Sequence, residues 1–393
     1  MKTALAVPGL ALIAAMAVAQ SPPTMAPNEN LVVEGVPPIP AALADTVARY
    51  TESRSATFQG WHPTRREMLI TTRFADTAQV HRVSMPGGAR TQLTFFPDRV
   101  QDATFPPVGG EFFLFRSDTG GNEFSQIYRY DLSGGAVTLL TDGKSQNGGI
   151  RWSHRGDRFA YGSTRRNGRD RDLYVMDPRD PKSDRKLLEV EGGGWGVLAW
   201  SPDDEQLLVS ESISANESYL WLVGVRTGER KLLTPKGGAE KVDYNGGQFA
   251  RDGKAIYVTT DRESEFHRLA LVDLATGRHT YFTTHIPWDV SGFVLSRDGG
   301  TLAFVTNEDG ADTLHLMDTT TGKERPAARF GLGEITDLEW RPQQPELALS
   351  FASAQSPKDV YTVEAATGRV ERWTESETGG LEAASLAKPE LVR

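Results

Sequence analysis

One stretch of the chain decides the fold: Trp200-Ser201-Pro202-Asp203-Asp204-Glu205-Gln206-Leu207-Leu208-Val209. It places an aromatic residue before a small polar turn, and the turn leads into a short apolar strand. The same order recurs along the chain, with an aromatic residue or a leucine in first place. The starting points are Trp61-His62-Pro63, Phe105-Pro106-Pro107, Trp152-Ser153-His154, Trp200-Ser201-Pro202, Phe249-Ala250-Arg251, Leu295-Ser296-Arg297 and Trp340-Arg341-Pro342.

The spacing between these starting points is nearly constant. Subtracting successive residue numbers gives 44, 47, 48, 49, 46 and 45 residues. A period of about 40 to 50 residues is typical of the blades of β-propellers. One four-stranded blade cannot bury both faces of its sheet, so the units have to pack radially around a channel. We therefore predict an all-β fold, a seven-bladed β-propeller of four-stranded antiparallel blades over residues 55–381.

A second landmark follows about 20 residues later in each unit and supports four strands per blade. It consists of a strand, a turn that contains glycine, and another strand. One example runs from Leu220-Trp221-Leu222-Val223 through Thr227-Gly228 to Lys231-Leu232-Leu233. Glycine supplies the positive φ that a tight hairpin turn needs.

The composition describes a globular and acidic protein. Hydrophobic residues make up 38% and charged residues 24%, which excludes a disordered or fibrous chain. The formal net charge is −9 over 393 residues. We expect no nucleic-acid partner, because binding to phosphates needs a basic face.

Residues 1–19 have the pattern of a signal peptide. Lys2 supplies the positive start, residues 5–18 form a short apolar stretch, and Ala17-Val18-Ala19 is a small-residue cleavage site. The stretch is too short for a comfortable membrane span. The sequence contains no cysteine, which excludes thiol catalysis, zinc–thiolate sites and a lipid-modified cysteine. We predict a periplasmic or secreted protein that has no membrane association after cleavage.

Two further segments precede the first blade. Residues 20–39 are rich in Pro, Ser and Asn and are expected to form a flexible leader. Residues 40–54 are expected to form a short helical cap. Leu43, Val47 and Tyr50 share one face at helical spacing, which favours a cap packed on the propeller.

Several segments resemble the N-terminal propeller of the prolyl oligopeptidase family of serine peptidases, which includes dipeptidyl and acylaminoacyl peptidases. The segments that carry the resemblance are Arg54-Ser55-Ala56-Thr57-Phe58 with Gly60-Trp61-His62-Pro63, Gln92-Leu93-Thr94, Ser117-Asp118-Thr119-Gly120-Gly121-Asn122-Glu123-Phe124, Thr260-Asp261-Arg262-Glu263-Ser264-Glu265-Phe266 and Lys388-Pro389-Glu390-Leu391-Val392-Arg393. The resemblance extends over nearly the whole mature chain.

The resemblance implies a partner domain that this sequence lacks. In that family an α/β-hydrolase domain follows the propeller and carries a Ser-Asp-His triad, with the serine on a Gly-x-Ser-x-Gly elbow. The 393 residues contain no such elbow, and the nearest fragments, Gly143-Lys144-Ser145 and Tyr161-Gly162-Ser163, lack the second glycine. We expect no catalytic residue in this chain, and we interpret residues 382–393 as a linker toward a missing hydrolase domain.

The loops between the second and third strands of each blade supply candidate contact residues. Equivalent loops of a propeller emerge on one face, where charges could meet a hydrolase domain or the ends of short peptides. In related dipeptidyl peptidases a pair of glutamates on the propeller grips the amino terminus of the substrate, and Glu263 and Glu265 are the nearest such pair. The candidates are Asn122, Glu123, Arg165, Arg166, Arg169, Glu211, Glu217, Glu263 and Glu265.

Other classes of site find little support. The seven histidines form no compact metal-binding pattern, and no phosphate-binding or dinucleotide-binding loop occurs, so we expect no metal and no cofactor. The leading prediction is a propeller that restricts the access of peptides to a serine peptidase. A stand-alone periplasmic interaction propeller of the TolB type is the alternative, and a metal-dependent propeller lactonase is a weaker one.

Overall fold

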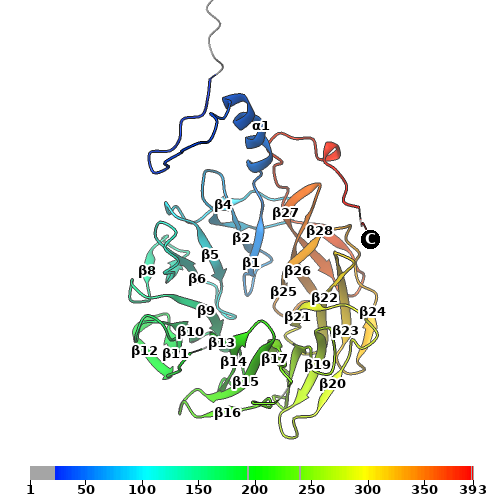
Figure 1. Ribbon diagram of the computed structural model, residues 1–393. Coiled ribbons are helices and arrows are strands. Elements are labelled where there is room, and N and C mark those ends of the chain that lie inside the picture. Colours follow the sequence, from blue (N-terminus) through cyan, green and yellow to red (C-terminus); the bar gives the residue numbers. More distant parts are fainter. Residues whose placement is uncertain (1–22, 193, 239, 391, 393) are drawn as a thin grey trace, which may run out of the picture.

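The computed structural model describes residues 23–192, 194–238, 240–390 and 392. Seven four-stranded sheets surround a central axis (Figure 1). The first three are β1 (Thr57–Trp61), β2 (Met68–Thr72), β3 (Gln79–Val83) and β4 (Thr91–Gln92); β5 (Val100–Thr104), β6 (Phe112–Ser117), β7 (Gln126–Asp131) and β8 (Val137–Leu139); β9 (Asn147–Trp152), β10 (Phe159–Ser163), β11 (Asp172–Asp177) and β12 (Asp180–Leu188).

The remaining four sheets continue in chain order. They are β13 (Gly194–Trp200), β14 (Gln206–Ser214), β15 (Glu217–Gly224) and β16 (Arg230–Leu232); β17 (Tyr244–Phe249), β18 (Ala255–Thr260), β19 (Arg268–Asp273) and β20 (His279–Tyr281); β21 (Val290–Leu295), β22 (Thr301–Glu308), β23 (Ala311–Asp318) and β24 (Lys323–Arg325); β25 (Glu334–Trp340), β26 (Glu346–Ser353), β27 (Ser356–Glu364) and β28 (Val370–Arg372). The predicted seven-bladed propeller is confirmed.

Apolar clusters lie between the blades, one at each of the seven interfaces. Each cluster combines side chains from two neighbouring sheets, as expected where a single sheet cannot bury both of its faces. Burial of apolar area therefore holds every blade to its two neighbours, and the stability of the ring is distributed around the whole circle.

The repeated aromatic residue stands at or just after the end of each inner strand. Where it is tryptophan, the indole can also donate a hydrogen bond to the inner strand of the preceding blade. Trp200 Nε1 donates to Arg151 O at 2.9 Å, Trp340 Nε1 to Val294 O at 3.1 Å and Trp61 Nε1 to Glu339 O at 3.3 Å. A buried indole N–H that finds such a partner avoids the cost of an unsatisfied donor. The sequence repeat therefore marks a contact between blades.

The ring closes without exchange of a strand between the first and last blades, because each sheet consists of four consecutive strands. Blade 1 packs against blade 7, and Phe58 N donates to Ser350 Oγ at 2.9 Å across this seam. Trp61 and Trp373 meet edge to face within the apolar cluster of the seam, with ring centroids 5.4 Å apart. Side-chain packing and a few hydrogen bonds thus join the two ends of the propeller.

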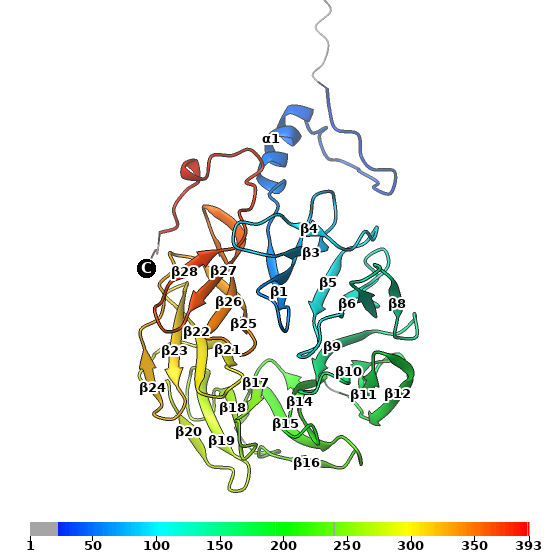
Figure 2. The same cartoon turned by 180° about the vertical axis from the view of Figure 1, so that it is seen from behind.

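The up-and-down order of the strands gives the ring two distinct faces. We call the face with the loops between first and second strands the mouth face. The opposite face carries the loops between second and third strands, and we call it the terminal face, because β1 starts there and β28 ends there. Figure 2 shows the segments that precede β1 and follow β28 on the same side of the ring, beside blades 1 and 7.

The segments before the first blade differ in part from expectation. The predicted signal peptide lies outside the described residues. A bridge between Thr24 and Pro40 folds the predicted leader into a loop. Helix α1 (Ala41–Thr51) forms, but the apolar face that we expected to pack on the propeller is exposed: Leu43, Val47 and Tyr50 are 55%, 52% and 64% exposed. In the part of the chain that the structure describes, no helix has the length and apolarity needed to cross a bilayer.

Candidate functional site

A cavity of about 800 Å³ occupies the axis of the propeller. The inner strands of all seven blades line it, and it opens between the loops of the mouth face. Its volume lies in the range of pockets that hold small ligands, about 300–1,000 Å³. Toward the terminal face it extends as far as Asn245 and Ser291, near the starts of β17 and β21.

Two positions of the repeat form this cavity. The second residue after the repeated aromatic or leucine always lies at the mouth. In chain order these residues are Pro63, Pro107, His154, Pro202, Arg251, Arg297 and Pro342. The residue just before the repeated position lines the wall in six blades, as Thr104, Arg151, Ala199, Gln248, Val294 and Glu339. Every inner strand contains a bulge, and in six blades the bulge directly adjoins the residue before the repeated position and bends the strand there.

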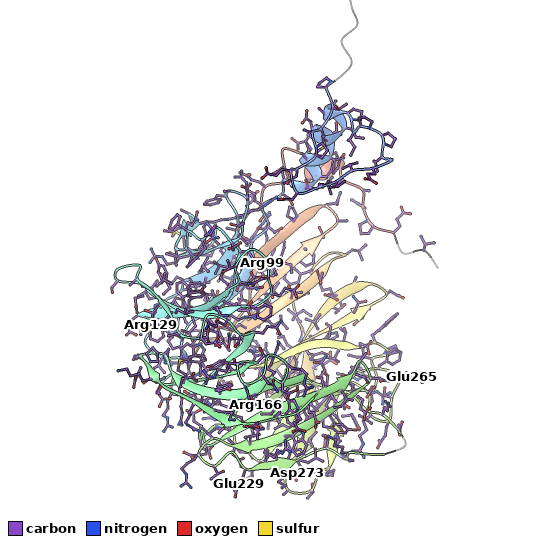
Figure 3. The ribbon with its side chains drawn as sticks, turned by 60° about the vertical axis from the view of Figure 1, so that its left-hand side comes forward. Arg99, Arg129, Arg166, Glu229, Glu265 and Asp273 are labelled. Atoms are coloured by element: carbon purple, nitrogen blue, oxygen red, sulfur yellow. The ribbon has the colours of Figure 1, made fainter. Side chains whose placement is uncertain are left out.

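None of the nine residues predicted from the loops lines the cavity. They lie on the terminal face, spread over four blades from the second to the fifth, as topology requires for loops between second and third strands. Figure 3 shows Arg166 and Glu265 well apart on the ring. The structure therefore does not bring these residues together into one site.

The predicted arginine cluster is neutralised within its own blade. Arg165 forms an ion pair with Asp184, and Arg166 Nε donates to Asp172 Oδ2 at 2.7 Å. Arg169 Nε donates to Asp170 Oδ1 at 3.0 Å, and this contact lowers the pKa of the Asp170 carboxyl. Paired guanidinium groups of this kind hold a loop in place, so little positive charge is left for a partner.

The glutamates of the fourth blade are also engaged. The sequence predicts a loop over residues 211–217, but β14 continues to Ser214 and β15 starts at Glu217, so a tight hairpin replaces the loop. Glu211 accepts hydrogen bonds from Lys236 Nζ at 2.8 Å and from Trp221 Nε1 at 2.9 Å. The Glu217 carboxylate pairs with Lys241 Nζ at 2.8 Å, and this contact lowers the pKa of Glu217.

The four remaining predicted residues are exposed at hairpin tips. Asn122 Oδ1 accepts from Phe124 N at 2.9 Å, and Glu123 N donates to Asp118 Oδ2 at 2.9 Å. Both contacts stabilise the local turn.

Glu263 takes a left-handed φ of 58° and pairs with Arg262 at 3.4 Å. Its neighbour Glu265 is exposed on the same hairpin. Both carboxylates remain open to solvent on the terminal face.

Four charged residues of the cavity were missed by the sequence reasoning: Arg151, Arg251, Arg297 and Glu339. Arg151 and Glu339 directly precede a repeated tryptophan, and Arg251 and Arg297 stand two residues after Phe249 and Leu295. Alignment of the seven repeats on the aromatic position would have found them, since charge is rare at those two positions in the other repeats.

Glu339 is the acidic member of this set and lies at the seam between blades 7 and 1. Its Oε1 accepts a hydrogen bond from Trp61 N at 3.2 Å. Burial raises the pKa of the Glu339 carboxyl to about 7. Gln248 occupies the equivalent place in blade 5, where Oε1 accepts from Leu295 N at 2.7 Å. The same link between blades is thus made by a neutral amide in one blade and by an ionisable group at the seam.

Comparison with known proteins identifies the family. The model of the prolyl oligopeptidase N-terminal β-propeller domain matches residues 99–376. The uncharacterized peptidase YuxL of Bacillus subtilis is 29% identical over 183 residues, which is 47% of this chain and 25% of that peptidase.

Solved structures share the fold. A puromycin hydrolase superposes with a TM-score of 0.70 at 18% identity, over 88% of this chain and 57% of that protein. Prolyl oligopeptidase B from Galerina marginata superposes with a TM-score of 0.70 at 14% identity, over 88% of this chain and 53% of the other. The chain thus spans about half the length of these two proteins. With the family model matched over most of its length, it belongs to the prolyl oligopeptidase family and carries that family's N-terminal β-propeller domain.

Proposed function

We propose that this propeller restricts which peptides reach the active site of a secreted serine peptidase, without taking part in the cleavage itself. The observation that carries the proposal is the axial cavity of about 800 Å³, lined by all seven blades and open at the mouth face. A ring of packed blades admits a short extended peptide along its axis but excludes a folded protein. Selection would therefore be by size.

We further propose that an α/β-hydrolase domain is the partner and that it covers the terminal face. Both ends of the propeller leave from this face. Exposed apolar side chains also occur there, in loops and strand ends of several blades: Phe74, Phe95, Phe124, Ile213 and Leu332. A domain that covers this face would bury these side chains. The exposed apolar side of α1 would extend the same surface.

In this proposal the hydrolase domain carries out the cleavage. The 393 residues contain no Gly-x-Ser-x-Gly elbow, the element that presents the nucleophile in this class of hydrolase. Short peptides would be the substrates, and the signal-like residues 1–19 would direct the protein to the periplasm or the medium.

Among the described residues no group of three or more His, Asp or Glu could hold a metal ion, so the lactonase alternative gains no support.

The test begins with the protein purified from its source and a fluorophosphonate probe that labels active-site serines. We expect the native protein to be labelled and the 393-residue chain alone to remain unlabelled. Labelling of the chain alone would overturn the non-catalytic role. A native protein of this length that is never labelled would favour the TolB-like alternative.

The size restriction needs a second measurement. The native peptidase and its hydrolase domain alone are compared on a labelled substrate of four residues and on the same sequence within an exposed loop of a folded domain. We expect the propeller to slow cleavage of the folded substrate at least tenfold while it leaves the short one unchanged. Equal discrimination with and without the propeller would contradict gating.

A further inference from the structure

The cavity is positively charged in a protein that is negatively charged as a whole. Three arginines line it, Arg151 from blade 3, Arg251 from blade 5 and Arg297 from blade 6. Glu339 is the one carboxylate among the lining residues, whereas the whole chain has a net charge of −9. A concave site lined by one sign of charge concentrates ligands of the opposite sign.

The three arginines contact neutral acceptors. Arg151 Nε donates to Leu198 O at 3.2 Å, and its Nη1 donates to Ile150 O at 3.0 Å. Arg251 Nη1 donates to Asp298 O and Arg297 Nη1 to Pro107 O, both at 3.1 Å.

Within the described residues no carboxylate lies in ion-pair distance of these three groups. In this they differ from Arg165, Arg166 and Arg169, each of which has a carboxylate partner.

Arg151 is the one of the three that stands on the cavity wall rather than at the mouth. Burial within the cavity lowers the pKa of its guanidinium, and the negative charge of Asp102 partly offsets this effect. A guanidinium has five N–H donors, and two of the Arg151 nitrogens carry the contacts given above. Its remaining donors can bind a carboxylate in the bidentate manner that arginine prefers.

Arg297 acts at the entrance. Its hydrogen bond to Pro107 O joins blade 6 to blade 2, two blades that are not neighbours in the ring, so the side chain crosses the mouth. The bond is a single exposed contact to a neutral carbonyl. Such a contact exchanges readily with water, and a carboxylate is a stronger acceptor for the same guanidinium.

We propose that the cavity binds the carboxyl terminus of short peptides, with Arg151 as the carboxylate ligand and with Arg297 moving from Pro107 O to cover the entering chain. The choice of a peptide rests on the proposed function, whereas the choice of a carboxylate rests on the unpaired arginines. The peptide then enters through the mouth face, and its amino end points toward the terminal face.

The experiment measures binding of Ala-Ala-Ala-Ala carrying an uncharged fluorophore at its amino end, by fluorescence anisotropy with the 393-residue chain. The peptide is used as the free acid and as the carboxyl-terminal amide. We expect the free acid to bind at least tenfold more tightly than the amide. Equal affinities, or no binding of either, would overturn the proposal.

Substitutions locate the site. R151Q should remove the preference for the free acid, and R297Q should weaken binding of the free acid at least threefold. The matched control is R278Q, which removes one exposed positive charge that does not line the cavity and should leave the preference unchanged. Preservation of the preference in both R151Q and R297Q overturns the assignment. If circular dichroism shows that R151Q is not folded, R297Q and R251Q test the assignment instead, because both side chains are exposed. Unchanged binding of the free acid in both variants then overturns the assignment.

A third peptide separates the two sources of a carboxylate. Ala-Ala-Asp-Ala amide carries its negative charge on a side chain, and binding as tight as that of the free acid would contradict recognition of the terminus. These measurements need no hydrolase domain. A failure of carboxylate binding is therefore distinguishable from a failure of size restriction, which is read from cleavage by the native peptidase.

Discussion

Replacement of Glu339 by glutamine isolates one titrating group at the place where the ring closes. Glutamine keeps the acceptor for Trp61 N, as Gln248 does for Leu295 N in blade 5, but it cannot ionise. The ordinary pKa of this carboxyl is 4.5, and burial raises it to about 7 in the folded protein. The folded state therefore holds the proton more tightly than the unfolded state.

The sign of the effect follows from linkage. Between pH 4.5 and 7 the folded state binds more protons than the unfolded state, so the free energy of unfolding falls as the pH rises. A shift of this size corresponds to about 3 kcal/mol, at about 1.4 kcal/mol per pKa unit. Because the side chain borders the cavity and keeps some contact with solvent, this figure is an upper value.

The assay is thermal unfolding of both proteins between pH 4 and 8.5, followed by tryptophan fluorescence. For a domain of this size 3 kcal/mol corresponds to about 4 °C in Tm, from an unfolding entropy of about 2 cal/mol/K per residue. We expect E339Q and the wild type to unfold together near pH 4, and E339Q to be more stable by up to about 4 °C at pH 8.

Because the two proteins are compared at each pH, the contributions of all other titrating groups to the Tm cancel in the difference. The converse substitution Q248E is the matched control, because it should introduce the same loss of stability with rising pH between blades 5 and 6. A difference in Tm between E339Q and the wild type that does not change with pH would refute the reasoning. So would a difference that grows toward acid pH.

Three further predictions concern the packing of the ring. Trp200→Phe removes the indole donor to Arg151 O and should cost about 1 kcal/mol in the free energy of unfolding by urea. Ser350→Ala leaves Phe58 N without its acceptor at the seam and should cost about 1–3 kcal/mol by the same assay. Burial lowers the pKa of His81, so stability is lost as the pH falls below 6.5; in His81→Asn the loss of Tm between pH 7 and 5 should be smaller.

The repeat was sufficient to predict the architecture because its spacing and composition both reflect one local need. Each blade needs a large side chain at the end of its inner strand to fill the interface with the neighbouring blade. Trp61, Trp200 and Trp340 are buried there, and each also donates its indole N–H to the preceding blade. A contact made once per blade leaves a period in the sequence.

The closure of the ring could not be predicted in the same way. It depends on contacts between residues about 300 positions apart, such as Phe58 N with Ser350 Oγ at 2.9 Å. These contacts occur once and obey no period. Neither residue type nor spacing indicates whether the last blade borrows a strand from the first, since both arrangements use the same strand patterns.

The charged loops were misleading for a related reason. A run such as residues 165–171 is conspicuous because its positive charges are adjacent in sequence. The carboxylate that neutralises Arg165 comes from Asp184 on β12, which only the folded blade brings close. The apolar face of α1 was misleading in the opposite sense, because helical spacing predicts an amphipathic helix but not the surface that covers it.

The arginines of the cavity differ from all of these, because their hydrogen bonds go to neutral carbonyl groups only. At the mouth position four of the seven repeats use proline, which stiffens a turn, and His154 contacts the buried Asp204. Arg251 and Arg297 each make a single exposed contact to a neutral carbonyl there. Arg151 replaces the small or neutral residues that most blades place on the wall. A neutral donor could make the same hydrogen bonds to carbonyl groups, so the positive charge of these three side chains supports the proposed binding of an anionic group in the cavity.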